Sequence, residues 1–370
     1  MFQSHYDVGG HKFANIFQAF DRSIETGQFC YYNLQPEWIE QIHSIQLQES
    51  INVNRLHSIY ADQLQTLRQK YKKLVLAYSG GTDSHTILDI ALKNNIFIDE
   101  VFIEFPGMLG ISNNNIVDKE SIDAYNFVKN ISQKKIGKLK ILKRTIEDYN
   151  YLNVENWWKN EKYCQDNLIR LRPFWGTWVS KYYENIDGIV ITGHEKPRLR
   201  YKNNKFYFFL TDTSSEYKII KNCLPFFLQP KIVVPYTYLV YEKIKDRLDY
   251  FTPVKDRHDF FWHIPKNNIK TFYESCGMIF LSEDSKNYAD KPKWGCHLNF
   301  KNQGILNGLE KNGHKDVKKK LLKTHKEVFE AYSGHDHLVE SDGTFVKTVE
   351  RYSQMFELND YKFICKGHDV

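Results

Sequence analysis

The chain has 370 residues, of which 42% are hydrophobic and 26% charged. This balance excludes a disordered chain and is typical of a globular protein, with enough length for a sizeable core and two domains. The formal net charge of +6 permits an anionic substrate such as ATP or RNA, but it does not indicate nucleic-acid binding.

The sequence also argues against membrane and metal-ribbon classes. No apolar run approaches the ~20 residues of a membrane span, and the polar start of the chain does not resemble a signal peptide. The cysteines contain no CxxC pair, which argues against a zinc ribbon and suits a reducing cytoplasm. They are Cys30, Cys164, Cys223, Cys276, Cys296 and Cys365. We therefore expect a cytoplasmic protein with no membrane partner.

Residues 1–72 precede the first predicted core strand, and we expect them to form a helical N-terminal segment. Helices are predicted around Asn15–Phe20 and over Ile51–Lys70. The second of these places Leu56 and Leu64 on one face, as a helix packed on a core would require.

The stretch Leu74–Leu92 predicts a buried strand, a glycine turn and a helix. Leu74–Tyr78 is an apolar run without polar alternation, which is typical of a strand covered on both faces. Ser79–Ser84 contains two adjacent glycines and several residues that cap helices. Free backbone amides, small hydroxyls and a helix N-terminus together favour an anion site, and phosphate is the commonest biological anion there.

The string Ser79-Gly80-Gly81-Thr82-Asp83-Ser84 lacks the lysine ending of a Walker loop and the spacing of a dinucleotide fingerprint. It resembles instead the SGGxDS loop of the N-type ATP pyrophosphatases, the PP-loop superfamily of adenine nucleotide alpha hydrolase-like proteins. The resemblance is nearest to the synthetase domain of asparagine synthetase-like proteins and to PAPS reductase-like proteins. The plainer alternative is a Gly-Gly turn with a capping serine or aspartate.

Further strands and helices alternate along residues 73–248, which we interpret as one domain. Strands are predicted over Glu100–Phe105, Leu139–Lys143 and Ile186–Gly193, and a helix over Asp118–Lys129. Such alternation predicts an α/β fold with a parallel sheet. The resemblance implies five strands in a HUP/Rossmann-like sheet with helices on both faces, and ligands at the carboxyl ends of the strands. The Trp-rich segment between the third and fourth predicted strands, Asn153–Tyr183, is predicted to be largely helical.

A second loop follows the fourth predicted strand. Thr192-Gly193-His194-Glu195 is loosely similar to the loop that faces the pyrophosphate loop in this superfamily. By that resemblance, Glu195 would help to hold magnesium and His194 would contact phosphate or an adenylated intermediate. Lys196 would neutralise charge on pyrophosphate.

The resemblance implies ATP and Mg²⁺ as cofactors and assigns the site residues. Asp83 and Glu195 are the implied metal ligands. The implied catalytic residues are Asp83, Ser84, His194 and Lys196. The implied nucleotide-binding residues are Ala77, Tyr78, Ser79, Gly80, Gly81, Thr82, Asp83, Ser84, Phe105 and Gly193.

Residues 249–370 carry no family motif, and we expect a mostly helical accessory region that helps to form the substrate site. Val346–Leu358 is predicted to be helical. Upstream of this region, Asn203-Asn204 predicts the turn of a hairpin. The surroundings of Cys276 and Cys296 resemble the cysteine tail of PAPS reductases only superficially, and buried structural cysteines are the better interpretation.

The implied activity is an AMP-forming synthetase that adenylates a carboxyl or carbonyl oxygen with release of pyrophosphate and then transfers the activated group to an amine, ammonia or a similar nucleophile. Phe2 stands where a glutamine-hydrolysing asparagine synthetase has its cysteine, so ammonia would come from solution or a partner subunit. Three alternatives stay open: tRNA or nucleobase modification by the same adenylation, PAPS reductase-like chemistry, and nucleotide binding without turnover.

Overall fold

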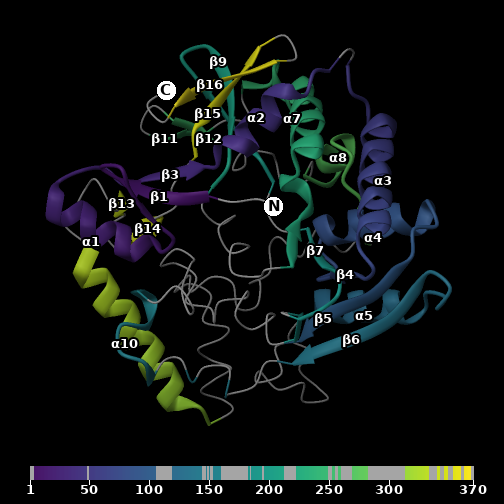
Figure 1. Ribbon diagram of the computed structural model, residues 1–370, viewed down its shortest axis with the longest axis horizontal. Coiled ribbons are helices and arrows are strands. Elements are labelled where there is room, and N and C mark those ends of the chain that lie inside the picture. The colour runs from purple at the N-terminus through teal and green to yellow at the C-terminus, as the bar shows by residue number, and fades with distance from the viewer. Residues whose placement is uncertain are drawn as a thin grey trace.

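The structure of the protein is a computed structural model (Figure 1). It describes residues 4–47, 50–105, 119–143, 147, 150, 153–159, 182–183, 185–193, 196–211, 222–248, 252–254, 257–259, 269–281, 313–332, 340–341, 346–348, 353–359 and 362–367.

A five-stranded parallel sheet lies at the centre of the α/β region, as predicted. Its strand order is β10-β7-β4-β5-β6, and every neighbouring pair is parallel. The strands are β4 (Leu74–Ala77), β5 (Ile98–Phe105), β6 (Ile136–Lys143), β7 (Ile189–Thr192) and β10 (Cys223–Pro225). Only β10 has no counterpart among the predicted strands, because three residues ending in proline carry too little pattern.

The order of these strands reverses between β4 and β7. The chain first builds β4, β5 and β6 toward one edge, and then places β7 and β10 on the other side of β4. In open α/β sheets, ligands bind at such a switch point, outside the carboxyl ends of the strands. The residues that follow β4 and β7 are therefore the ones that the topology brings to a ligand crevice.

The two faces of this sheet are both apolar, because successive side chains of a strand point to opposite sides. On the first face, Leu74 and Leu76 join the core cluster that contains apolar residues of α4 (Thr82–Lys93) and α5 (Lys119–Lys129). On the second face lie Val75, Phe102, Leu142, Val190 and Cys223, with Tyr183 packed against them. A sheet buried on both faces explains why β4 shows no polar alternation.

The N-terminal segment combines the predicted helices with a small sheet. The helices are α1 (Ile16–Thr26), α2 (Pro36–Ser44) and α3 (Val53–Lys70). A three-stranded antiparallel sheet of β1 (Ser4–Val8), β2 (His11–Phe13) and β3 (Tyr31–Leu34) accompanies them, so the lead-in is not purely helical.

A six-stranded antiparallel sheet joins the middle of the chain to its later part. Its order is β11-β12-β8-β9-β15-β16. Asn203 and Asn204, with φ of +53° and +60°, turn the hairpin between β8 (Arg198–Lys202) and β9 (Lys205–Phe209), as predicted. The remaining strands are β11 (Thr252–Val254), β12 (Arg257–Asp259), β15 (Met355–Asn359) and β16 (Lys362–Gly367).

The helix predicted over Val346–Leu358 is wrong. The segment contains β14 (Val346–Thr348), which pairs with β13 (Glu340–Ser341), and most of β15. Pairing with β9 and β16 gives the backbone of β15 its hydrogen-bond partners, and this tertiary context outweighs the local pattern.

Three further helices complete the described architecture. They are α7 (Pro230–Ile244), α8 (Ile269–Ser275) and α10 (Lys315–Tyr332). The described part of residues 249–370 thus holds strands as well as helices, and the expected boundary at residue 248 divides one sheet. Of the Trp-rich segment, Trp157–Lys159 form a 3₁₀ turn, and residues 160–181 lie outside the described residues. Among the described helices, none has the length and apolar character that a membrane crossing needs.

Candidate active site

The glycine loop leaves the carboxyl end of β4 and opens directly into α4. The amide of Tyr78 donates to the carbonyl of Phe102 at 2.9 Å, which prolongs the pairing of β4 with β5 by one residue. Gly80 has φ of +84°, a conformation that glycine adopts without strain, and Gly81 is the N-cap of α4. The loop is thereby turned sharply enough for the first amides of α4 to face the crevice.

Two hydroxyl groups close the loop into a compact ring. Ser84 Oγ donates to the carbonyl of Gly81 and accepts from the amide of Ser79, both at 3.2 Å. Ser79 Oγ accepts from the amide of Gly81 at 3.2 Å and lies 3.3 Å from Ser84 Oγ. Because the first amides of a helix have no partner within the helix, the N-terminus of α4 offers donors and a positive dipole end to an anion.

The end of β7 lies directly against the first turn of α4. A Cβ atom on Gly193 would come within 2.6 Å of the Ser84 amide nitrogen and 2.8 Å of the Asp83 carbonyl carbon. Both are backbone atoms, so a side chain here requires the strand or the helix to move. Gly193 therefore sets how closely the second loop approaches the glycine loop.

Lys196 reaches Asp83 from this second loop. Its ammonium forms a hydrogen-bonded ion pair with Asp83 Oδ1, and the side chains are 11% and 32% exposed, respectively. The structure thus brings together two of the predicted catalytic residues, 113 positions apart. His194 and Glu195 lie outside the described residues, as does the side chain of Phe105, whose backbone pairs with Lys143 at the end of β5.

Three phenols and one thiol lie near this ion pair: Tyr60, Tyr236 and Cys276 are buried, and Tyr273 is partly buried. Burial raises the pKa values of Tyr60, Tyr236 and Tyr273, with smaller contributions from Cys276 and from Asp83. Burial likewise raises the pKa of Cys276 to about 12. All four groups are therefore protonated at neutral pH, and Cys276 is a buried structural cysteine, as predicted, rather than a nucleophile.

Sequence reasoning missed His85 and α8. His85 is buried, and burial lowers its pKa to about 4, so the imidazole is neutral when its Nδ1 lies 2.9 Å from the Tyr78 hydroxyl. The segment at the end of α8 docks on α4 through a 2.8 Å bond from the Ile279 amide to Thr86 Oγ1. His85 directly follows the Ser79–Ser84 motif, so its position in the sequence could have identified it. Nothing in the sequence pattern indicates the contact between Ile279 and Thr86.

The described residues of this site suit a metal ion that is bound together with a nucleotide. In the described part of the chain, no group of three or more His, Cys, Asp or Glu side chains could hold one. Magnesium in nucleotide sites uses one or two carboxylates together with phosphate oxygens. Asp83 provides one such carboxylate, which suits magnesium that arrives with ATP.

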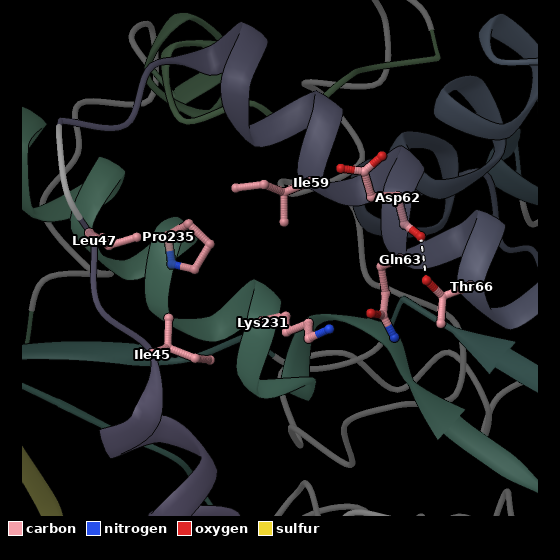
Figure 2. A pocket seen from close by; sticks show the side chains of 8 residues that line it. All are labelled: Ile45, Leu47, Ile59, Asp62, Gln63, Thr66, Lys231 and Pro235. Carbon is pink, nitrogen blue, oxygen red and sulfur yellow. Dashed lines mark hydrogen bonds between the residues drawn. The ribbon is translucent and has the colours of Figure 1, made fainter.

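A separate cavity lies away from the glycine loop, between the α2–α3 connection, α3 and α7 (Figure 2). It has a volume of about 260 Å³ and contains none of the predicted site residues. Its lining combines apolar and polar side chains: Ile45, Leu47, Ile59, Asp62, Gln63, Thr66, Lys231 and Pro235.

Comparisons with known proteins leave the family open. No family profile matches the sequence, and no curated protein matches it. A U34-tRNA thiolase, NcsA from Methanococcus maripaludis with its 4Fe-4S cluster, is similar at 13% identity, with a TM-score of 0.27. The match covers 80% of this chain and 84% of that chain. A TM-score this low does not establish a common fold, so the functional interpretation rests on the site itself.

Proposed function

We propose that the protein is an ATP-dependent, AMP-forming enzyme that adenylates an oxygen atom of its substrate and releases pyrophosphate. The observation that carries this proposal is the position of the Ser79–Ser84 loop. It joins a buried parallel strand to the N-terminus of α4 at the switch point of the sheet, and Lys196 pairs with Asp83 from the loop that follows the neighbouring strand β7.

The proposed reaction has two steps. A carboxylate or carbonyl oxygen of the substrate attacks the α-phosphorus of ATP, the bond from that phosphorus to the bridging oxygen breaks, and pyrophosphate leaves with the electron pair. A nucleophile such as ammonia or an amine then attacks the activated carbon and displaces AMP. The protein contributes by positioning the reactants and by neutralising charge.

Each described residue of the site has a proposed role in this reaction. The amides of Gly80, Gly81 and Thr82 and the hydroxyls of Ser79 and Ser84 would hold the leaving pyrophosphate. Lys196 would offset its negative charge. Magnesium, bound with ATP and held by Asp83, would supply further charge neutralisation. The roles proposed for His194 and Glu195 follow from the resemblance of their loop alone.

The decisive assay follows ATP labelled at the α-phosphate. Purified protein is incubated with magnesium and labelled ATP, with and without a cell extract, and in parallel with the extract's RNA fraction alone. We expect labelled AMP and free pyrophosphate in a reaction that Asp83→Asn abolishes. Asp187→Asn is the matched control, because Asp187 is an exposed carboxylate that pairs with Lys72 before the start of β7.

Each outcome separates the competing functions. AMP formation that needs the RNA fraction would favour the alternative of tRNA or nucleobase modification, whereas a need for small molecules would favour the synthetase. ADP in place of AMP would overturn the proposal. ATP binding that depends on Asp83 but gives no product with any fraction would favour a binding protein without turnover.

A further inference from the structure

Lys196 is held from two sides in this structure. Its ammonium pairs with the Asp83 carboxylate, and it also lies 5.7 Å from the ring centroid of Phe227 and 5.7 Å from that of Tyr273. A cation within about 6 Å of an aromatic centroid is attracted by the ring. The lysine side chain is 11% exposed, so water competes weakly for the ammonium.

The two rings come from separate parts of the chain. Phe227 belongs to a 3₁₀ turn, Phe226–Leu228, directly after β10, and Tyr273 belongs to α8. Figure 1 shows α8 beside α7 and α3. The segment after α8 is fixed at two points, because the Ile279 amide donates to Thr86 Oγ1 and a ring nitrogen of His57 lies 2.8 Å from the carbonyl of Gly277.

Nucleotide binding would change the charge partners of both Asp83 and Lys196. Asp83 is the carboxylate proposed to hold the nucleotide's magnesium, and Lys196 is the cation proposed to bind pyrophosphate, yet each is now the other's partner. When the nucleotide enters, both groups must exchange partners. A lysine on a flexible stem would lose its position during that exchange unless something else held it. The aromatic rings attract the ammonium without competing for it as a counter-ion.

We propose that Tyr273, together with Phe227, is a positioning residue for Lys196. The rings keep the ammonium at the glycine loop while its counter-ion changes from the Asp83 carboxylate to the pyrophosphate group of the nucleotide. This inference rests on the proposed function, since it names the parts of the same site that fix the cation. It also assigns a role to α8, which lies in the region without a family motif.

The test measures the binding of inorganic pyrophosphate by calorimetry, without added metal, to the full chain. A ring contact of 1–2 kcal/mol corresponds to roughly 5–30-fold in affinity, so we expect Tyr273→Leu to weaken binding by that factor. Tyr273→Phe keeps the ring and should bind within about twofold of the wild type. Tyr6→Leu removes a fully buried tyrosine ring from the N-terminal sheet and should leave binding unchanged.

A double-mutant cycle distinguishes positioning from general damage. In a Lys196→Met background, Tyr273→Leu should weaken pyrophosphate binding no further, because the ring then has no cation to hold. An equal loss in both backgrounds, or unchanged binding of Tyr273→Leu, would overturn the inference. Should Tyr273→Leu fail to fold, Phe227→Leu tests the second ring in the same cycle. A wild type that neither binds pyrophosphate nor forms AMP would instead overturn the proposed function.

Discussion

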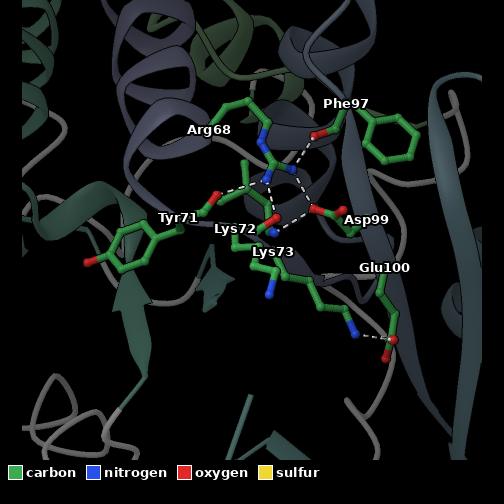
Figure 3. Close-up of polar contacts among 8 residues, drawn as sticks. Arg68, Tyr71, Lys72, Lys73, Phe97, Asp99 and Glu100 are labelled. Carbon is green, nitrogen blue, oxygen red and sulfur yellow. Dashed lines mark hydrogen bonds and ion pairs between the residues drawn. The ribbon is translucent and has the colours of Figure 1, made fainter. Parts of the chain in front are cut away.

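The amino ends and the carboxyl ends of the parallel strands form two sides of the sheet, which we call its amino edge and its carboxyl edge. These two edges use ion pairs in different ways. At the amino edge, Arg68 in α3 bonds Asp99 of β5 and also donates to the carbonyls of Tyr71 at 2.8 Å and Lys72 at 2.5 Å (Figure 3). Asp99 Oδ2 in turn accepts from the amide of Leu74 at 2.7 Å. These contacts tie the end of α3 to the first residues of β4 and β5.

Glu100, next to Asp99, likewise has several partners, which lie around the second face of the sheet. Its carboxylate accepts from the Tyr183 hydroxyl at 2.6 Å and from Lys73 at 3.0 Å. Burial opposes the ionisation of Glu100, but these hydrogen bonds and the charges of Lys73 and Lys140 together outweigh it and lower the pKa of Glu100. A group with a lowered pKa in the folded state stabilises the fold above its ordinary pKa, and this contribution is lost as the pH falls through the folded value.

At the carboxyl edge, by contrast, Asp83 and Lys196 pair with each other, and Asp83 is about one-third exposed. At the amino edge, the charges of Arg68, Asp99 and Glu100 each have several partners, which suits a structural connection. Among the described residues of the carboxyl edge, Asp83 and Lys196 form an ion pair that a ligand can exchange. The number of partners of each charge, more than the presence of an ion pair, therefore distinguishes a structural edge from one that can exchange partners with a ligand.

Two glycines that flank β7, one at each edge of the sheet, provide the most severe test of this difference between the amino edge and the carboxyl edge. A Cβ on Gly188, before β7, would meet the Lys73 carbonyl oxygen at 2.2 Å, and one on Gly193, after β7, would meet the Ser84 amide nitrogen at 2.6 Å. Crowding backbone in this way costs about 1–3 kcal/mol. We expect Gly188→Ala and Gly193→Ala to lower the free energy of unfolding comparably, measured by urea denaturation.

Pyrophosphate binding should then separate the two glycine variants. Measured under conditions in which both variants are folded, the affinity for pyrophosphate should fall at least tenfold in Gly193→Ala and stay near the wild-type value in Gly188→Ala. The control is Gly313→Ala, where the added Cβ meets no atom within 4 Å, although its φ of +81° still costs some stability. Equal binding by both variants would contradict the division between the edges.

His85 predicts a pH dependence that arises at the carboxyl edge. Its folded pKa of about 4 lies below the ordinary value, so the unfolded chain binds the proton more readily. Stability from neutral His85 is therefore complete above about pH 6.5 and is lost toward pH 4, by up to roughly 3 kcal/mol. His85→Gln should flatten this part of the stability profile in urea titrations at several pH values. His11→Gln, at an exposed position, should not, and an unchanged profile for His85→Gln would refute the assignment.

A pair of basic-residue substitutions tests the same comparison through the charges of the two edges. Arg68→Met should lower the free energy of unfolding by about 2 kcal/mol, because it leaves Asp99 without its cation and the Tyr71 and Lys72 carbonyls without this donor, and should leave pyrophosphate binding unchanged. Lys196→Met should show the reverse, with weaker pyrophosphate binding and a smaller loss of stability. Lys72→Met, which removes an exposed partner of Asp187, should change neither. A binding loss in Arg68→Met would show that the two edges are coupled.

The strand, loop and helix around Ser79–Ser84 were predictable because their pattern is local. The apolar run of β4, the glycines and the start of α4 lie within a few residues of one another, and each supports the others. The hairpin at Asn203-Asn204 was predictable for the same reason. The resemblance further pointed to Lys196, which the structure brings to Asp83.

Other features depend on contacts between distant segments and left no local pattern. The strand β10 is three residues long and gains its identity from pairing with β7. The strand β15 was predicted as helix, although its partners are β9 and β16. Tyr273 is a tyrosine in a short helix, and its relation to Lys196 exists only after α8 docks on α4. Such contacts are decided by tertiary packing, which single-sequence patterns do not encode.

The antiparallel sheet has a consequence for the order in which the site forms. Lys196 lies two residues before β8, whose hairpin partner β9 pairs with β15. During synthesis, the glycine loop leaves the ribosome long before residues 355–359. Until those residues are made, the β8–β9 hairpin that anchors the Lys196 segment lacks β15, the strand that pairs with β9. We infer that a ribosome-bound chain can fold its glycine loop early, but fixes the position of Lys196 only after residues 355–359 have been made.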